Sequence, residues 1–221
     1  MIKTLIKYYA EFDSMSVGKL AIELSKLESF SVPDIKEEQY ITDSQIAAHW
    51  LNNADILDDI EGKIVMDLGA GTGILSIGAA LLGAKRVILV EKDKSALEAA
   101  KKNISLYEDL PVELSHGNIE DDKFCEGLKK KEVDVIIQNP PFGTKQKHAD
   151  RLFLEKAFGL GKVVYSMHKT TSQDFLEAFA KDNGFRITHR WDYYFPIKNV
   201  YNYHKKRIQR IKVGVWRFEK A

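Results

Sequence analysis

The sequence predicts an α/β fold with a mostly parallel sheet of seven strands, a C-terminal antiparallel hairpin and an N-terminal helical flank. From residue 63 onward, short apolar runs alternate with helical patterns, which is typical of a parallel sheet covered by helices on both faces. The last two strand-like runs have no helix between them, so they are expected to pair as an antiparallel hairpin. Before this alternation begins, the patterns are helical.

Three helices are predicted in the flank, residues 1–60, the first of them within residues 1–17. Apolar side chains recur near helical spacing in residues 18–30, which indicates an amphipathic helix. Another helix is predicted from Thr42 through about Ile60, because Thr42 and Gln45 have the T-x-x-Q spacing of a capping box. The sequence has no repeat, low-complexity tract or clear linker, so the flank is expected to belong to one domain with the rest of the chain.

The alternating region, residues 61–221, is predicted to be the α/β core of that single domain, which spans residues 1–221. Its strands are expected within residues 63–69, 85–93, 111–117, 132–139, 161–167, 185–195 and 207–218. Its helices are expected within residues 71–83, 95–107, 121–130, 150–159 and 171–182.

The composition is that of an ordinary globular protein, with 44% hydrophobic and 29% charged residues. No apolar stretch approaches the roughly 20 residues that a membrane helix needs, and the first residues lack the features of a signal peptide. The single cysteine, Cys125, excludes an internal disulfide and a Cys-rich zinc site, so we expect a reducing, cytoplasmic setting and no metal site. A net charge of +1 does not suggest wholesale coating of nucleic acid.

A glycine-rich loop follows the first strand and reads DLGAGTG. Glycines at such a turn let the backbone approach a ligand and expose N–H groups at the start of a helix. A dinucleotide-binding fingerprint would place its third glycine one position later, at Ile74. An ordinary tight turn is the alternative interpretation. The residues of this loop predicted to bind a cofactor are Asp67, Gly69, Ala70, Gly71 and Gly73.

An acid, Glu91, stands at the end of the next strand. A carboxylate about 20 residues beyond the glycine loop can accept hydrogen bonds from both hydroxyls of a ribose. Alone it could be a solvated acid after a strand. Together with the loop it predicts a nucleoside at the carboxyl edge of the sheet, which fits NAD-type cofactors and S-adenosylmethionine equally well.

The stretch Asn139-Pro140-Pro141-Phe142 ends a later apolar run. An exocyclic amine on an aromatic ring is a poor nucleophile, unless acceptors hold its hydrogens so that its lone pair can face an incoming methyl group. The Asn139 side-chain oxygen and the Pro140 carbonyl can be these acceptors, and the two prolines stiffen the backbone between them. Phe142 can stack on a base turned out of its helix. The alternative is a strand terminator followed by a core phenylalanine.

The glycine loop followed by Asn-Pro-Pro-Phe resembles class I S-adenosylmethionine-dependent amino-methyltransferases. The longer stretches from Asn139 to Lys145, from Val164 to Lys169 and from Tyr203 to Lys206 resemble the methyltransferase-like protein 5 family more narrowly. This resemblance implies a Rossmann-like fold, S-adenosylmethionine as the cofactor, and transfer of a methyl group to N6 of an adenosine in small-subunit ribosomal RNA.

The resemblance also assigns cofactor-binding roles outside the glycine loop. Gln39, Tyr40 and Thr42 would close over the methionine end of the cofactor, and Asn118, Ile119 and Asn139 are also predicted to bind it. Asn118, followed by Ile119, stands where relatives usually carry Asp to bind the adenine amine, and an amide oxygen can still accept that bond. Another departure is Ile41, which stands where the family usually has proline.

A basic stretch gives the predicted RNA contacts. Six Lys or Arg and no Asp or Glu occur between Lys198 and Lys212, and their mixture with aromatic residues suits phosphate contacts and stacking. A solvated strand edge is the alternative, because lysine protects edge strands from pairing. The predicted RNA-binding residues are Lys145, His168, Tyr203, His204, Lys205, Lys206 and Arg207.

The resemblance further implies a protein partner, the small zinc-binding protein that activates several methyltransferases. We expect it to form a heterodimer with this chain by strand addition near Val112 to Leu114, an outer strand in the usual sheet order.

Three other functions stay open. Methylation of a protein glutamine would use the same acceptor groups on a side-chain amide. A non-catalytic RNA-binding or ribosome-assembly module could retain the same scaffold. A dehydrogenase is the weakest alternative, because the third glycine is misplaced and no proton-relay residue accompanies the loop.

Overall fold

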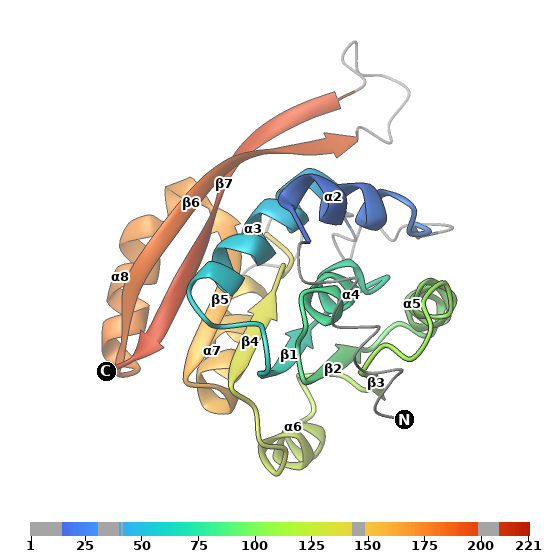
Figure 1. Cartoon of the computed structure of the whole chain (residues 1–221). Helices are drawn as coiled ribbons and strands as arrows, with labels where there is room; N and C mark the ends of the chain where they lie inside the picture. Colours follow the sequence, from blue (N-terminus) through green and yellow to red (C-terminus); the bar gives the residue numbers. More distant parts are fainter. Residues whose placement is uncertain (1–14, 31–39, 41, 143–148, 199–207) are drawn as a thin grey trace.

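The computed structural model describes residues 15–30, 40, 42–142, 149–198 and 208–221, and its centre is a seven-stranded sheet (Figure 1). The strand order is β3-β2-β1-β4-β5-β7-β6. The strands are β1 (Ile64–Leu68), β2 (Arg86–Glu91), β3 (Val112–His116), β4 (Val135–Gln138), β5 (Val163–Lys169), β6 (Phe185–Lys198) and β7 (Ile208–Lys220). The predicted number of strands and their places in the chain are confirmed.

The sheet is mostly parallel. Strands β1 to β5 are paired in parallel, whereas β7 is antiparallel to both of its neighbours, β5 and β6. The predicted C-terminal hairpin is therefore confirmed. Because the carboxyl ends of parallel strands lie at one edge of a sheet, the segments that follow β1, β2 and β4 meet there.

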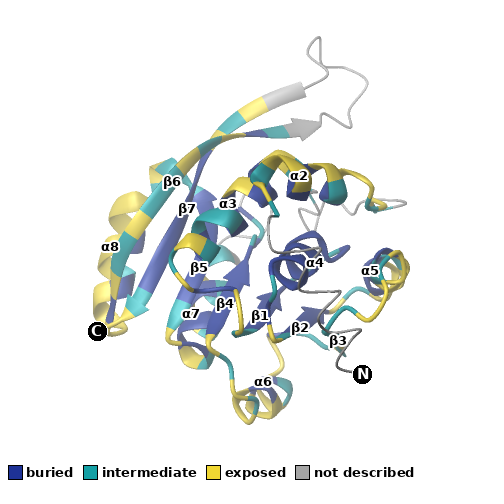
Figure 2. Ribbon diagram, in the orientation of Figure 1, coloured by how far each residue is buried: buried dark blue, intermediate teal, exposed yellow. Residues whose placement is uncertain are grey.

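Helices cover both faces of this sheet, as predicted. One face carries α2 (Val17–Ser25), α3 (Ser44–Ile56), α4 (Ile74–Leu81) and α5 (Lys94–Ile104), and the other carries α6 (Asp122–Lys129), α7 (Ala149–Leu160) and α8 (Gln173–Asp182). Successive strand residues point to opposite faces of the sheet. Val65 therefore packs in the hydrophobic core under α2, α3 and α4, and Met66 packs in the core under α6, α7 and α8. Figure 2 shows burial concentrated in the central strands and α4, whereas α5, α6 and α8 expose their outer sides.

The start of α3 differs from the prediction. Asp43, not Thr42, is the N-cap, and its Oδ1 accepts hydrogen bonds from the backbone N–H groups of Gln45 (3.0 Å) and Ile46 (3.3 Å). A carboxylate next to Thr42 competes successfully for these donors, because Asp is at least as good an N-cap as Thr. The predicted capping box is therefore wrong, and the helix ends at Ile56 rather than Ile60.

Buried polar contacts join the flank to strands β5 and β7 of the sheet. Asp59, which follows α3, is 7% exposed and accepts from Arg217 Nε on β7 (2.7 Å) and from the Tyr165 hydroxyl on β5 (2.6 Å). Trp50 of α3 and Val215 of β7 also belong to one hydrophobic core. These contacts pack the flank against the α/β core, and the single domain stays a prediction.

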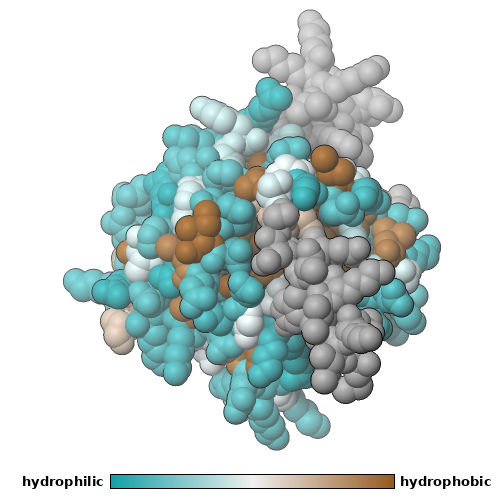
Figure 3. Space-filling view, in the orientation of Figure 1, coloured by the Kyte–Doolittle hydropathy of each residue, from teal (hydrophilic) through white to brown (hydrophobic). Residues whose placement is uncertain are grey.

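The described residues on one face of the molecule are largely polar at the surface. On the face drawn in Figure 3, the apolar side chains of the described residues form small, separate groups among hydrophilic ones. Among the described residues, no helix has the length and apolar character needed to cross a membrane.

Candidate active site

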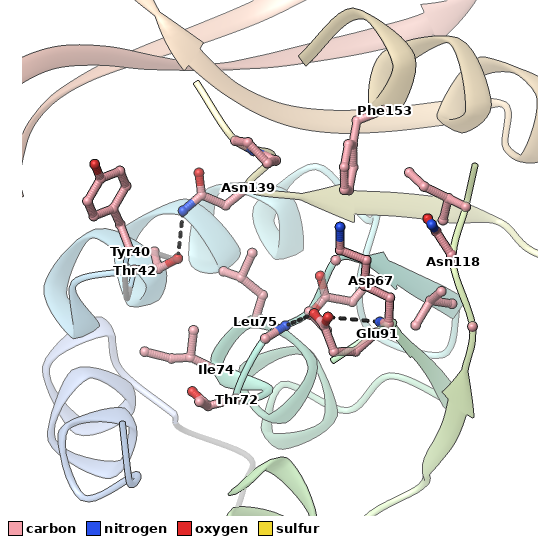
Figure 4. A pocket seen from close by; sticks show the side chains of 18 of the residues that line it. Tyr40, Thr42, Asp67, Thr72, Ile74, Leu75, Glu91, Asn118, Asn139 and Phe153 are labelled. Atoms are coloured by element: carbon pink, nitrogen blue, oxygen red, sulfur yellow. Dashed lines mark hydrogen bonds between the residues drawn. The ribbon is translucent and has the colours of Figure 1, made fainter. Parts of the chain in front are cut away.

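A pocket opens at the carboxyl edge of the sheet, where the segments after β1, β2 and β4 meet (Figure 4). The described residues that were predicted to bind a cofactor and that line this pocket are Tyr40, Thr42, Asp67, Gly69, Ala70, Gly71, Glu91, Asn118, Ile119 and Asn139. Pro141 also lines it. The fold thus brings together residues that are up to about a hundred positions apart in the chain.

The glycine loop lines one side of the pocket, where its glycines present bare backbone. Gly69 and Gly71 have positive φ angles of 68° and 57°, which side-chain-bearing residues rarely adopt. A Cβ on Gly69 would lie 2.7 Å from the ring of Phe153, and one on Gly71 would lie 2.9 Å from the ring of Phe30. Gly73 is instead the N-cap of α4 and does not line the pocket.

Glu91 presents a fixed carboxylate to the glycine loop. Its Oε2 accepts from the N–H of Gly71, and its Oε1 accepts from the N–H groups of Lys92 and Asp93, all at 2.8 Å. A carboxylate offers about four acceptor positions, so capacity remains for a ligand hydroxyl. The backbone therefore preorganises the acid that the sequence predicted as the ribose acceptor.

Asp67 is a buried carboxyl group at the end of β1. Its Oδ2 accepts from the Ser76 hydroxyl at 2.7 Å, whereas Oδ1 has no partner in the described part of the chain. Burial raises the pKa of Asp67 to about 7, against the opposing effect of the Ser76 hydrogen bond, and nearby Glu91 raises it further. A half-satisfied carboxyl group in a pocket is suited to receive a cationic ligand group.

The Asn139 amide is oriented by the flank. Its Nδ2 donates to Thr42 Oγ1 at 2.9 Å, while its Oδ1 is buried and has no partner among the described residues. Figure 4 shows the two side chains facing one another at one end of the pocket, with Tyr40 beside them. The donor end of the amide is therefore occupied, and the oxygen is left to accept a hydrogen bond from a ligand.

The rest of the Asn-Pro-Pro-Phe motif is partly in the core. Pro140 is buried, and Phe142 is 8% exposed and packs edge-to-face on Phe195 of β6, with ring centroids 5.7 Å apart. Phe142 thus makes the core contact that was the alternative interpretation. Its stacking on a substrate base, and the acceptor role of the Pro140 carbonyl, stay predictions.

Asn118 lines the opposite end of the pocket, after β3. Its Oδ1 accepts from the N–H of Glu120 at 3.0 Å, and its Nδ2 donates to Glu120 Oε2 at 3.3 Å. A carbonyl oxygen has two lone pairs, so Oδ1 can still accept a second bond. Glu91 lies between Asn118 and Asn139 in Figure 4, so the predicted groups line one continuous pocket.

Most of the predicted RNA contacts lie outside the described residues, namely Lys145, Tyr203, His204, Lys205, Lys206 and Arg207. The same holds for Gln39, which was predicted to bind the cofactor. His168 is described, and it is 1% exposed with its Nε2 2.7 Å from Ser166 Oγ. Burial lowers the pKa of His168 to about 3, so it is neutral. A direct contact of this ring with RNA phosphates was therefore a wrong expectation.

Two aromatic residues of the pocket were missed in the sequence. Phe30, just after α2, and Phe153 of α7 line it and pack on the glycine loop. Neither belongs to a recognisable motif. The available signal was indirect, because the missing Cβ atoms of Gly69 and Gly71 leave room for rings from elsewhere in the chain.

Comparison with known proteins settles the family. A model of the ribosomal protein L11 methyltransferase family (PrmA) matches residues 15–140. The match includes strands β1 to β4 and ends before β5. The Drosophila melanogaster rRNA N(6)-adenosine-methyltransferase Mettl5 is 35% identical over 215 residues, covering 93% of this chain and 97% of the relative. This chain belongs to the methyltransferase-like protein 5 family. The resemblance inferred from the sequence motifs is thereby confirmed.

Members of this family match along nearly their whole length. The Danio rerio rRNA N(6)-adenosine-methyltransferase METTL5 is 33% identical over 209 residues, covering 92% of this chain and 99% of the relative. A crystal structure from Pyrococcus horikoshii, provisionally assigned as an RNA methyltransferase, has a TM-score of 0.84 at 42% identity and covers 94% of this chain and 99% of that one. The fold is thus the Rossmann-like fold of class I methyltransferases, as predicted.

Proposed function

We propose that this chain uses S-adenosylmethionine to methylate N6 of an adenosine in small-subunit ribosomal RNA. The observation that carries the proposal is the Asn139 amide, whose N–H is held by Thr42 and whose buried oxygen is free to accept. The METTL5 relatives are rRNA N6-adenosine methyltransferases, and an amide oxygen can accept a hydrogen bond from an adenine amine. A cytoplasmic setting is part of the proposal.

The residues present fit S-adenosylmethionine. The unpartnered Asp67 oxygen suits its ammonium group, and the preorganised Glu91 carboxylate suits its ribose hydroxyls. Gly69 and Gly71 have no room for a Cβ, because the rings of Phe153 and Phe30 lie against them, so both residues present bare backbone to the pocket that they line. When bound, this cofactor supplies a methyl group on a positively charged sulfur.

Methyl transfer then depends on how the chain holds the adenine amine. In the proposed reaction the bond from sulfur to the methyl carbon breaks as the bond from N6 to that carbon forms, and the sulfur becomes neutral. Asn139 Oδ1 accepts one N6 hydrogen and turns the nitrogen lone pair toward the carbon. The methylated nitrogen, briefly cationic, loses a proton to water. Alignment of this kind can supply up to about 7–11 kcal/mol of the barrier.

The hairpin is a suitable surface for RNA. Phe195 of β6 touches Phe142 of the acceptor motif, and the adjacent Tyr194 is 69% exposed. Tyr194 pairs across the hairpin with Lys212, and Arg210 on β7 is exposed. An exposed ring beside two cations offers stacking and phosphate contacts on the outer face of the hairpin, whose inner face carries Phe195 against the acceptor motif. This adds described residues to the predicted contacts of the basic stretch.

A protein partner at β3 is also part of the proposal. β3 is an outer strand among the described residues, and Leu114 on it is 38% exposed. An outer strand offers backbone groups for strand addition by the predicted zinc-binding activator. Co-purification of that activator with the wild-type chain, and its loss when Leu114→Pro removes a backbone donor from the edge, would support the heterodimer. Full activity of the monodisperse chain alone would oppose an obligatory partner.

The central test is a nucleoside analysis. Small-subunit RNA from cells that lack this protein would be treated with the purified chain and S-adenosylmethionine, digested, and analysed by mass spectrometry. We expect N6-methyladenosine with the wild type and at least about a hundredfold less with Asn139→Ala, because misplacement of the amine is enough to lose that factor. Cofactor binding by Asn139→Ala should persist.

Two other outcomes would replace the proposal. Label from tritiated cofactor in protein rather than RNA would indicate methylation of a protein glutamine. RNA binding with no transfer to either fraction, in the presence of the activator, would indicate a non-catalytic RNA-binding or ribosome-assembly module.

A further inference from the structure

We propose that Asn103 is a positioning residue of the cofactor site, which anchors the segment from Leu27 to Phe30 against the glycine loop so that Phe30 forms one wall of the pocket. The inference rests on the proposed use of S-adenosylmethionine. Asn103 belongs to α5 and is itself outside the pocket lining, so its effect on the cofactor is transmitted through Phe30 and the loop.

Asn103 makes three hydrogen bonds although its side chain is fully buried. Its Oδ1 accepts from the N–H of Glu28 at 2.7 Å, and its Nδ2 donates to the carbonyl of Glu28 at 3.0 Å. The same Nδ2 donates to the carbonyl of Thr72 at 3.0 Å. One amide therefore ties the segment after α2 to the glycine loop, across 75 positions in the chain.

Both tied segments belong to the same corner of the pocket. Thr72 follows Gly71, and Phe30 follows Glu28 by two residues. The ring of Phe30 lines the pocket and lies so close to Gly71 that a Cβ there would be 2.9 Å from it. The N–H of Gly71 in turn donates to Glu91, the predicted ribose acceptor. Displacement of this corner would disturb a cofactor-binding wall rather than a remote part of the core.

The chemistry at this position requires an amide. Glu28 offers one donor and one acceptor, and Thr72 offers an acceptor, so the side chain must both accept and donate twice. An aspartate carboxylate could accept from the Glu28 N–H, but it has no hydrogen to donate to the carbonyl oxygens of Glu28 and Thr72. A leucine would fill the space without making any hydrogen bond. The other buried side chains of α5 include Ala96 and Ala100, so a polar residue is not needed here for packing.

The test combines two substitutions, Asn103→Leu and Phe30→Ala, separately and together, with S-adenosylmethionine affinity measured by calorimetry on the full chain without RNA. Each single variant should weaken binding about tenfold. Because both act through the same wall, the double variant should be little weaker than either single one, which a double-mutant cycle detects. In Asn103→Leu alone, the Glu28 amide should also lose its protection from hydrogen exchange.

Leu176→Ala is the matched control. Leu176 is fully buried in α8 on the opposite face of the sheet, so its truncation should lower thermal stability without changing cofactor affinity beyond twofold. Affinities of Asn103→Leu and Phe30→Ala that also stay within twofold of the wild type, or strictly additive losses, would overturn the inference. Cofactor binding that responds as expected in a chain that does not methylate RNA would support the inference while contradicting the proposed function. A wild type that binds no S-adenosylmethionine would overturn both.

Discussion

At the scale of single residues, the hydrogen bond between Asn139 and Thr42 orients the Asn139 amide, for which we propose the catalytic role. Thr42→Val keeps the shape of the side chain but removes the acceptor, so the amide loses the group that fixes its orientation. We expect kcat for RNA methylation to fall about tenfold, the typical effect of losing roughly 1.4 kcal/mol of transition-state stabilisation. Thr42→Ser retains the oxygen and should stay near the wild type.

Steady-state kinetics with RNA and cofactor varied separately would measure this effect. Loss of kcat with unchanged KM for RNA would fit an orienting role for Thr42. An unchanged kcat with a raised KM for the cofactor would instead assign Thr42 to cofactor binding alone, as the family resemblance implied.

Asp67 gives a pH-dependent prediction at the same scale. Burial raises its pKa to about 7, so the carboxyl group is largely protonated at pH 6 and largely ionised at pH 7.5. An ammonium ligand favours the ionised form. Cofactor affinity measured by calorimetry should therefore rise several-fold from about pH 6 to about pH 7.5. Asp67→Asn should bind weakly and lose this dependence, and a flat profile in the wild type would contradict the role.

The same shift predicts how stability depends on pH. Between the ordinary carboxyl pKa of 3.8 and about 7, the folded protein keeps a proton on Asp67 that the unfolded chain has lost. The unfolded state then binds fewer protons at this group, so its contribution to stability falls as the pH rises through that window. Asp67→Asn should remove the fall, and urea unfolding at several pH values would measure it. An unchanged slope in the variant would contradict the shift.

At the scale of elements, the start of α3 links a helix cap to the active site. Asp43 caps the helix next to Thr42, so Asp43→Ala should lower the free energy of unfolding by about 0.5–2 kcal/mol and loosen the turn that holds the Thr42 hydroxyl. Asp43→Asn keeps an acceptor oxygen and is the control. Urea unfolding measures the stability, and equal stability of the two variants would show that the cap contributes little.

This element also shows what the sequence could predict. The alternation of apolar runs and helical patterns was sufficient for every strand and for the hairpin, because buried strands need continuous apolar residues. The cap was assigned to the wrong one of two neighbours, Thr42 and Asp43, since both side chains can accept from a helix start. Only the backbone course decides which oxygen faces the free N–H groups, and a local pattern does not contain that information.

At the scale of the whole molecule, sequence-based prediction is limited by how far apart in the chain two contacting residues stand. The glycine loop, Glu91 and Asn139 were found because each stands at the end of a strand, where parallel topology gathers ligand-binding groups. Phe30, Phe153 and Asn103 were missed because their roles come from packing against residues tens of positions away. No motif marks such residues, so only the assembled fold identifies them.

The contact of Asp59 with Arg217 makes the last prediction, because it joins the flank to the final strand over 158 positions. Both side chains are about nine-tenths buried, with 9% and 10% exposed, so removal of Asp59 takes from a buried guanidinium its shorter carboxylate contact and leaves it the longer one, to Glu219 at 3.6 Å. Asp59→Leu should cost about 3–5 kcal/mol, and the additional change Arg217→Met should recover much of it. Arg186→Ala, which breaks the exposed pair with Glu219, should have no measurable effect.

If the chain is one domain, amides of α3 and β5 should exchange hydrogen through the same global unfolding in the wild type. Exchange of α3 at a clearly lower free energy than β5 would make the flank a separate folding unit, and the cost of Asp59→Leu would then appear in α3 alone.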